Sequence, residues 1–297
     1  MLNLLRAEWT KTAGNRWASG FLIWIFPVGM LAFVLITALL VLLVPSMRSE
    51  EGVQRMGLYD VRWTDQAISV WEWLNGLMGR IILLAFTSIV FAGEYQWQTW
   101  KNIIPRRNRV ALILIKFVTV GLFVLFAFTL MSLIYGVGSV IITELAGGTH
   151  GPRVSLDVMT TFLRDYVRYA ALAFTLTMIA ASFSALAGML MRSILGGVIV
   201  GVVATYTEGL SILIFMLIGR LFDLPKIVYL YRVTPSYNVA NIKSWLMNGI
   251  PEAENITFLG DMVDFSDGMV FSIVLLGVWV CFLIGLTTTL FYRQDIT

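Results

Sequence analysis

The side chains that most often perform acid–base, nucleophilic or metal chemistry are nearly absent from this chain. It contains one histidine, His150, and one cysteine, Cys281, among 297 residues. A single histidine excludes metal sites built from several imidazoles and argues against histidine-based catalysis. A single cysteine excludes a disulfide framework and a cysteine-based metal cluster. The sequence therefore predicts no catalytic residue and no metal-ligating set.

The phosphate-binding motif of ATPases is also missing. No Gly-x-x-x-x-Gly-Lys-Ser/Thr pattern occurs, so the chain has no loop to cradle phosphates and no lysine for the β- and γ-phosphates. We expect this chain to bind no cofactor and to be no enzyme. If it drives transport, the energy must come from a partner.

Two charged residues do interrupt apolar segments. Arg80 precedes the apolar run of residues 81–92, and Glu208 lies in the apolar segment of residues 194–218. An ionised side chain inside a bilayer costs several kcal/mol unless it is paired or hydrated, and such residues usually mark functional pathways. Arg80 and Glu208 are therefore candidates for a pathway through the protein.

One further motif is similar to a motif found in an enzyme family. Residues 50–55 spell Glu-Glu-x-x-x-Arg, which is similar to a motif of one family of membrane proteases. In that family the motif lies in a helix and works together with additional histidines. Here it falls in a polar loop, and the chain has only His150. We therefore expect no protease activity.

The overall composition identifies the class of protein. Hydrophobic residues make up 58% of the chain, and its mean hydropathy is +0.82. Charged residues make up only 13%, against about 25% in ordinary soluble domains. A soluble domain needs more charge to cover its surface, and a disordered chain has far fewer apolar residues. What remains is a multi-pass membrane protein.

The apolar segments predict an all-α integral membrane protein with six transmembrane helices. A span needs about 20 apolar residues, because the hydrocarbon core is about 30 Å thick. Five segments meet this length clearly. The second segment is weaker, and we include it because Trp71 and Trp73 suit an interfacial aromatic belt. The predicted spans are residues 21–44, 71–92, 112–134, 169–191, 194–218 and 269–291.

Charge distribution predicts the orientation. Six spans place both termini on one side of the membrane, and that side carries far more basic than acidic residues. Positive residues mark the cytoplasmic side, so we expect a multi-pass protein of the cell membrane with cytoplasmic termini. The basic residues of that side are Arg6, Lys11, Arg16, Lys101, Arg106, Arg107, Arg109, Lys116, Arg192 and Arg293; the acidic ones are Glu8, Glu94 and Asp295.

The predicted orientation allows the depths of Arg80 and Glu208 within the membrane to be compared. With 1.5 Å of rise per residue, Glu208 lies roughly 21 Å and Arg80 roughly 18 Å from the cytoplasmic ends of their spans. These depths match, so we predict that the two side chains face each other across a cavity. The alternative is that each extends separately to the outer headgroups. Small residues such as Gly188 and Gly197 could allow close helix contacts, more plausibly within one chain than between chains.

Two segments outside the spans are expected to contact the membrane surface. Residues 1–20 predict an interfacial helix, because Leu2, Leu5, Trp9 and Ala13 share one helical face. Residues 219–268 form the longest outside loop. Its short apolar pieces, residues 227–231 and 242–246, suggest helices at the outer interface, and a plain solvent loop is the alternative.

The cytoplasmic loop of residues 93–111 has the most informative pattern. We expect a short helix over residues 94–104, with Glu94 near its N-terminus, where the helix dipole favours an acid. Pro105 would end it, because the residue before a proline disfavours helical geometry. This loop resembles that of the ABC-2 type permeases, the membrane subunits of a class of ABC transporters. The matching residues are Glu94, Tyr95, Thr99, Lys101, Pro105, Arg109 and Lys116, and Gln98 departs from the glycine common there.

The resemblance implies a function. In such permeases this loop forms a coupling helix that docks on a cytoplasmic ATPase. Two permease subunits pair, and two ATPase subunits bind ATP with Mg²⁺ and move them. The implied coupling residues are Glu94, Tyr95, Thr99, Lys101, Arg106 and Arg109, and Arg80 and Glu208 would lie on the translocation path.

The family further implies an exporter in contact with lipid and ATPase partners, and we expect no nucleic acid among its partners. A membrane anchor that transports nothing is the alternative. The pattern leaves open the substrate and the choice between a homodimer and a heterodimer.

Overall fold

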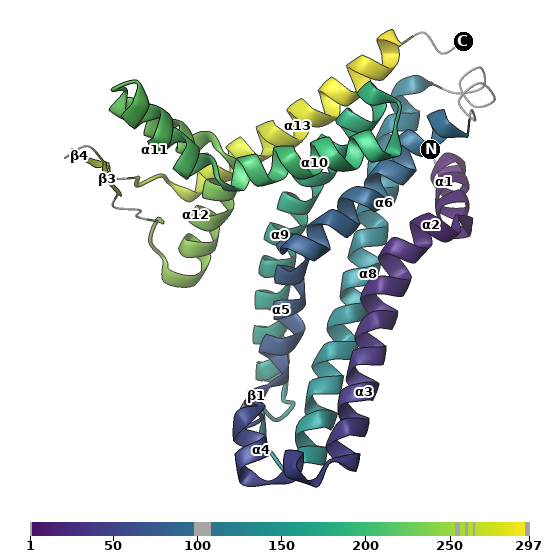
Figure 1. The fold of residues 1–297 in the computed structure, drawn as a ribbon, viewed down its shortest axis with the longest axis vertical. Coiled ribbons are helices and arrows are strands. Elements are labelled where there is room, and N and C mark those ends of the chain that lie inside the picture. The colour runs from purple at the N-terminus through teal and green to yellow at the C-terminus, as the bar shows by residue number, and fades with distance from the viewer. Residues whose placement is uncertain (1, 98–107, 253–255, 259–260, 264, 295–297) are drawn as a thin grey trace. The chain divides into compact units, whose positions relative to one another are not determined.

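The computed structural model describes residues 2–97, 108–252, 256–258, 261–263 and 265–294 (Figure 1). The chain divides into two compact units. The first comprises residues Met1–Phe86 and Phe117–Phe174, and the second Thr87–Lys116 and Thr175–Thr297. Three long helices, α6, α8 and α9, contribute residues to both units.

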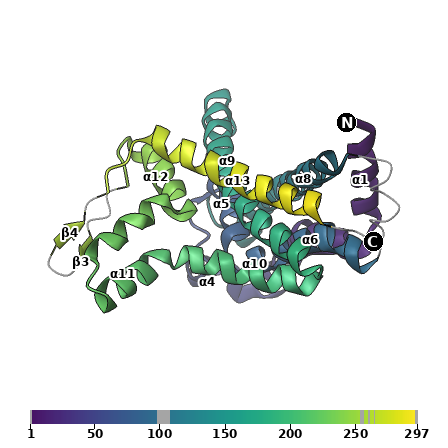
Figure 2. The ribbon, with the colours of Figure 1, turned by 90° about the horizontal axis from the view of Figure 1, so that it is seen from above.

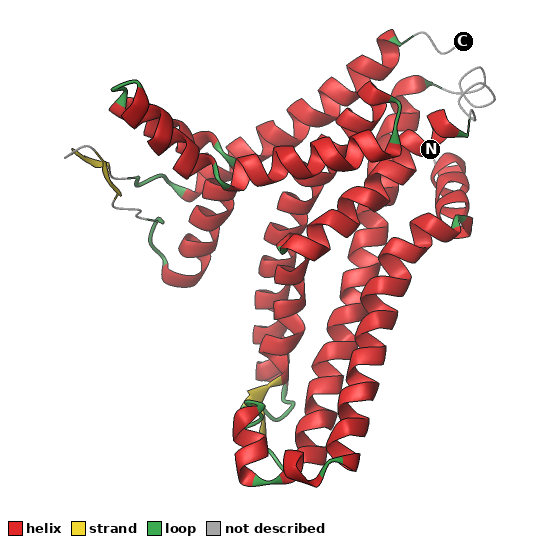
Figure 3. Cartoon of the chain, in the orientation of Figure 1, coloured by secondary structure: helices red, strands yellow, loops and turns green. Residues whose placement is uncertain are grey.

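Helices make up most of both units (Figure 3). Two pairs of short strands accompany them: β1 and β2 are parallel, and β3 and β4 are antiparallel. The α-helices are α1 Leu2–Gly14, α2 Arg16–Ser19, α3 Gly29–Leu43, α4 Glu50–Arg55, α5 Trp63–Asn75, α6 Leu77–Gln96, α8 Arg109–Ala146, α9 Leu156–Met191, α10 Ile194–Gly209, α11 Ser211–Leu221, α12 Pro235–Asn248 and α13 Met269–Arg293. The π-helix η1 spans Gly20–Val28, the 3₁₀ helices are η2 Pro45–Arg48 and η4 Pro225–Val233, and the strands are β1 Val61–Arg62, β2 His150–Gly151, β3 Ile256–Phe258 and β4 Asp261–Val263.

The helices are long and apolar enough to span a membrane several times. Five candidate spans occur among the described residues: Arg16–Leu43, Leu77–Gln96, Arg109–Ala146, Leu156–Met191 and Met269–Arg293. Helices α10 and α11 count as a sixth only if they form one span, because they meet at an angle of 68°. The prediction of an all-α membrane protein is confirmed, and the predicted straight span over residues 194–218 is bent after Gly209.

The second predicted span is divided in the structure. Helix α5 ends at Asn75, and Gly76 has an extended backbone with ψ of 166° before α6 begins. A side chain at Gly79 could not fit, because its Cβ would lie 2.0 Å from the carbonyl oxygen of Trp73. Two glycines thus allow a break where the apolar pattern predicted a continuous helix.

Helices α8 and α9 exceed the predicted spans. They contain 38 and 36 residues, so each is roughly 55 Å long, against about 30 Å for a hydrocarbon core. Much of the segment between the third and fourth predicted spans is therefore helical. The extension of α9 is polar, because its first four turns contain Asp157, Arg164, Asp165 and Arg168.

Aromatic contacts hold the first unit together. Trp9 of α1 stacks on Phe123 of α8 with ring centroids 4.2 Å apart, and Phe26 and Trp71 both contact Phe128. On α1 the buried residues are Glu8 and Thr12, whereas Leu2 is 83% exposed. The predicted apolar face of α1 therefore packs only in part: Leu5 and Trp9 are half-buried, whereas Leu2 and Ala13 are exposed.

Small residues bring three helices of the second unit close together. The hydroxyls of Ser88 on α6 and Ser184 on α9 lie 2.7 Å apart and are fully buried. A Cβ placed on Gly197 of α10 would lie 2.9 Å from the Cα of Gly188 on α9. The contact anticipated for Gly188 and Gly197 is present within a single chain.

A polar network joins η4, α12 and the residue Asp267 before α13 in the second unit. Helix α12 packs beside the start of α13, as both views show (Figures 1 and 2). Asp267 accepts hydrogen bonds from both Nε and Nη2 of Arg232 and from the hydroxyl of Tyr237. Its backbone oxygen accepts from Asn241 and Trp245. The apolar segments of residues 227–231 and 242–246 are helical, within η4 and α12, and their position at the interface stays a prediction.

This network predicts a pH-dependent stability. The Arg232 hydrogen bonds lower the pKa of Asp267 below its usual 3.8, so the ionised carboxylate stabilises the fold above that pH. The contribution is lost as the pH falls below 3.8 through the lowered pKa. At neutral pH, Asp267→Asn should speed amide exchange over α12, measured by hydrogen–deuterium exchange, and the difference from wild type should shrink in acid.

The exposed Asp223 supplies the control for this experiment. It has a positive φ of 53°, which asparagine also tolerates, so Asp223→Asn should leave exchange over α12 unchanged. Equal exchange in the Asp267→Asn variant and wild type at neutral pH would contradict the assigned role of Asp267.

Candidate functional site

A buried ion pair joins the two helices on either side of the predicted coupling loop. The Nζ of Lys116 on α8 lies 2.9 Å from Oε1 of Glu94 on α6, and both side chains are 1% exposed. The same ammonium donates to the carbonyl oxygen of Val90 at 2.8 Å. Two opposite charges at this distance, shielded from solvent, tie the end of α6 to the second turn of α8.

The position of Glu94 corrects the prediction from sequence. We expected Glu94 near the start of a helix over residues 94–104, but it lies in the last turn of α6, which runs on to Gln96. An acid is unfavourable at a helix C-terminus, and the ammonium of Lys116 compensates for it. Thr99, Lys101, Pro105 and Arg106 lie outside the described residues.

The role of Lys116 also differs from the expectation. The charge distribution counted it only as one of the basic residues of the cytoplasmic side and assigned it no partner, whereas its side chain is buried. Burial of a lysine requires a partner, and Glu94 lies 22 residues away on a different helix. Two of the motif residues therefore form one buried pair.

A second group of contacts surrounds the end of α13. The hydroxyl of Tyr95 donates to Oε1 of Gln294, and Nε2 of Gln294 donates to the carbonyl oxygen of Met189 at 3.1 Å. Nη1 of Arg109 lies 3.0 Å from the carbonyl oxygens of Tyr292 and Gln294. The sequence-predicted residues Glu94, Tyr95 and Arg109 are thus gathered in one region of the second unit.

Sequence reasoning missed Gln294 and assigned no specific role to Arg192. The guanidinium of Arg192 lies 5.9 Å from the ring centroid of Tyr95, a distance at which a cation–π interaction is effective. The only signal for Gln294 was its polar side chain shortly after the last predicted span, and polar residues are too common there to identify a contact.

The carboxylate of Glu208 has a specific partner in the second unit. It accepts hydrogen bonds from the backbone N–H of Ser236 at 2.7 Å and from the Ser236 hydroxyl at 2.8 Å. Ser236 is the second residue of α12, so the carboxylate lies at the positive end of that helix. The bond joins the last turn of α10 to α12, next to the 68° bend.

Arg80 lies in the first unit and is 8% exposed. Because Glu208 belongs to the second unit, the predicted pairing of Arg80 with Glu208 stays a prediction. The apolar pattern placed Glu208 within a helix, as α10 confirms, but it gave no indication of Ser236, which lies 28 residues later.

The Glu208 contact leads to a testable stability effect. Glu208→Ala removes the acceptor for two N-terminal groups of α12, so it should destabilise the protein by about 1 kcal/mol, as for lost helix caps. Ser236→Ala keeps the backbone donor and should cost less. Thermal unfolding in detergent measures both variants, and an equal loss in the two would show that the backbone bond contributes nothing.

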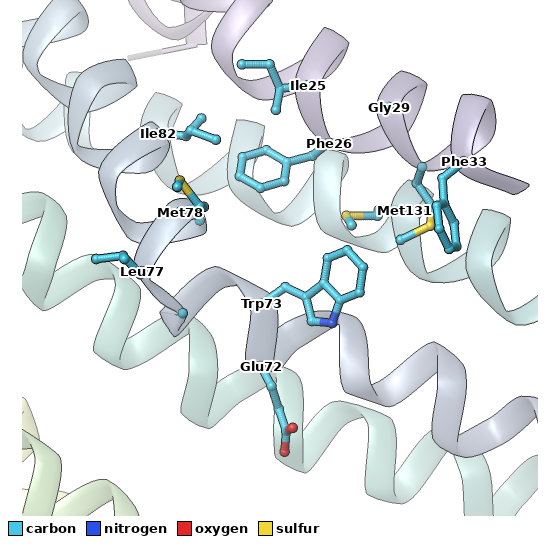
Figure 4. Close-up of a pocket in the computed structure, with 13 residues that line it drawn as sticks. Ile25, Phe26, Gly29, Phe33, Glu72, Trp73, Leu77, Met78, Ile82 and Met131 are labelled. Carbon is cyan, nitrogen blue, oxygen red and sulfur yellow. The ribbon is translucent and has the colours of Figure 1, made fainter. Parts of the chain in front are cut away.

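The first unit contains a cavity beside the break between α5 and α6 (Figure 4). Its volume is about 730 Å³, within the usual range for ligand pockets. Phe26, Met131 and Met78 lie around it, and the carboxylate of Glu72 points away from them. The lining is suited to an apolar group, since hydrocarbon, aromatic and thioether side chains predominate.

The described part of the chain contains no candidate metal site, and it places the protease-like motif in a surface helix. No group of three or more His, Cys, Asp or Glu residues there is arranged to hold a metal ion. The Glu-Glu-x-x-x-Arg motif, which we expected in a loop, forms helix α4. Its Glu51 and Arg55 pair at 3.3 Å with more than 80% of each side chain exposed, as in an ordinary surface helix.

The comparisons with known proteins identify the family. The model of the family described as ABC-2 family transporter protein matches residues 4–208, more than half of the chain. Comparison with curated proteins gives no match, and comparison with solved structures gives none either. The matched region contains four of the predicted spans, the first part of the fifth and the loop with Glu94 and Tyr95. This chain belongs to the ABC-2 transporter family, as a membrane-embedded permease component with several apolar spanning helices.

Proposed function

We propose that the chain is the membrane subunit of an ATP-driven exporter. It pairs with a second permease subunit and binds two cytoplasmic ATPase subunits, which carry ATP and Mg²⁺. Both termini and the loop of residues 93–111 face the cytoplasm, and the cell membrane surrounds the spans. Family membership supports a transport role, and the absence of a P-loop motif supports a separate ATPase.

The observation that carries this proposal is the buried pair of Glu94 and Lys116. A loop transmits force only when its ends are held firmly by the elements that it is meant to move. The pair fixes the α6 end of the loop to α8, and Arg109 attaches the start of α8 to the end of α13. Both ends of the loop are therefore held by contacts with spanning helices.

The residues have distinct proposed roles. Glu94, Tyr95 and Arg109 position the loop through the contacts described above. Thr99, Lys101 and Arg106 are proposed to meet the ATPase surface. Arg80 and Glu208 are proposed to lie on the translocation path, because charges within apolar spans usually mark such paths.

Purification of the tagged permease with its ATPase tests the proposal. The complex should hydrolyse ATP, and the charge reversals Lys101→Glu and Arg106→Glu should lower ATPase recovery or its turnover. Arg55→Glu reverses an exposed charge outside the loop and serves as the matched control. If no ATPase co-purifies, the transporter assignment is wrong. If the ATPase binds but its turnover is the same with the loop variants as with the wild type, the protein is better described as an anchor.

A charge exchange tests the proposed path. Arg80→Glu and Glu208→Arg should each abolish transport-dependent resistance or efflux, and the double exchange should restore it if the two side chains face each other. Failure of the double variant to recover would reject the pairing while leaving the ATPase assignment intact.

A further inference from the structure

Gln294, immediately after α13, has an unusual set of contacts for a residue at the end of a helix. Its backbone N–H donates to the carbonyl oxygen of Leu290 at 3.1 Å and closes the last turn of α13. Its backbone oxygen accepts from Arg109, its side-chain oxygen accepts from Tyr95, and its side-chain nitrogen donates to Met189. Both backbone polar groups and both side-chain polar atoms are therefore hydrogen-bonded.

These four contacts connect four helices. Leu290 belongs to α13, Arg109 begins α8, Tyr95 lies in the last turn of α6, and Met189 lies in the last turn of α9. The amide orientation is well defined, because a tyrosine hydroxyl can donate to the oxygen and a carbonyl oxygen can accept only from the nitrogen. A glutamine is therefore specifically suited to this position.

Charge strengthens the same junction. The cation of Arg109 lies against the carbonyl groups at the C-terminus of α13, where the helix dipole favours a positive charge. Hydrogen bonds from a charged donor are roughly twice as strong as neutral ones. The end of α13 is thus held more firmly to α8 than neutral contacts would hold it.

The contacts of Gln294 lie at both ends of the predicted coupling loop. Tyr95 precedes the loop region outside the described residues and Arg109 follows it, and both bond to Gln294. If α6 and α8 shift together while α13 stays in place, at least two of these bonds break. If the bonds persist, α13 moves with them, and Met189 carries the displacement to α9.

We infer that Gln294 is a positioning residue that links movement of the coupling loop to the last membrane span. The inference rests on the proposed coupling to an ATPase and adds α13, which lies beyond the family match of residues 4–208, to the moving parts. Gln294 contacts neither substrate nor nucleotide in this scheme, and it acts through Tyr95 and Arg109.

The single cysteine gives a direct readout of α13. Cys281 is exposed on that helix, so an environment-sensitive fluorophore attached there reports its surroundings. A second reporter is placed at the exposed end of α6 by Gln96→Cys in a Cys281→Ser background. The permease–ATPase complex is reconstituted in lipid, and fluorescence is compared before and after addition of ATP with Mg²⁺.

In the wild-type background both reporters should respond to nucleotide. Gln294→Leu has similar bulk and keeps the backbone bond to Arg109, but it loses both side-chain hydrogen bonds, so it should retain the response at residue 96 and weaken that at residue 281. Tyr292→Leu is the matched control, because the Tyr292 side chain is 67% exposed and its carbonyl oxygen stays available to Arg109. Both reporters should respond in that variant.

The outcomes separate this inference from the proposed function. A wild-type complex with no nucleotide response at either reporter, or one that retains no ATPase, contradicts the proposed function itself. A full response at residue 281 in the Gln294→Leu complex overturns the inference alone. Loss at both reporters in Gln294→Leu, with the ATPase still bound, also overturns it, because Gln294 would then be required for movement of the loop itself.

Discussion

Lys116→Met is expected to destabilise the protein by about 3–5 kcal/mol, the usual effect of removing one member of a buried ion pair. The substitution keeps the bulk of the side chain but removes the ammonium from Glu94, which is 1% exposed. The carboxylate then remains at a helix C-terminus without its cationic partner, where the helix dipole also disfavours it. Thermal unfolding of the purified protein in detergent measures the loss; under the proposed coupling, the turnover of the bound ATPase should also fall.

Two further variants make this result specific to the pair. Glu94→Leu combined with Lys116→Met removes both charges, and apolar replacements of a buried pair are often neutral or stabilising, so the double variant should recover much of the lost stability. Arg55→Met breaks an ion pair that is more than 80% exposed and should have little effect. Additive losses in the double variant would show that Glu94 and Lys116 do not depend on each other.

Gly197→Leu is expected to prevent correct packing of α10 in the second unit. Even the first carbon of a side chain at this position would lie 2.5 Å from the Ser88 hydroxyl oxygen and 2.9 Å from the Cα of Gly188. A backbone atom cannot move aside as a flexible side chain can, so helices α9 and α10 must separate. Gly197→Ala should already cost about 1–3 kcal/mol, the usual effect of overpacking, and Gly197→Leu should abolish recovery of folded protein.

Gly285 on α13 is the matched control for this substitution. It is also a helical glycine in a candidate span, but nothing lies within 4 Å of a Cβ added there. Gly285→Ala should therefore leave the melting temperature unchanged or raise it. Recovery and melting temperature in detergent, compared for Gly197→Ala and Gly285→Ala, test the prediction. A melting temperature for Gly197→Ala equal to that of the wild type would contradict the close contact with Gly188.

The class of the protein and the positions of its apolar helices followed from local properties of the sequence. Hydropathy averaged over about 20 residues is enough to find a span, because a span must be apolar wherever the chain places it. The motif around Glu94 and Tyr95 indicated the family, and the family model later matched residues 4–208. The same local reasoning missed the break at Gly76 and the bend after Gly209, although Asn75 and Glu208 directly precede these glycines, because a polar residue beside a glycine does not by itself fix the backbone geometry.

The partners of the polar residues were decided only by the tertiary structure. Lys116 was an ordinary cation in the sequence and became half of a buried pair because α8 packs against the end of α6. Tyr95 and Gln294 are 199 residues apart and bond to each other, and Glu208 takes its hydrogen bonds from Ser236. Composition determines whether a side chain enters a membrane, but a hydrogen bond depends on distance and direction, which exist only once the helices are packed.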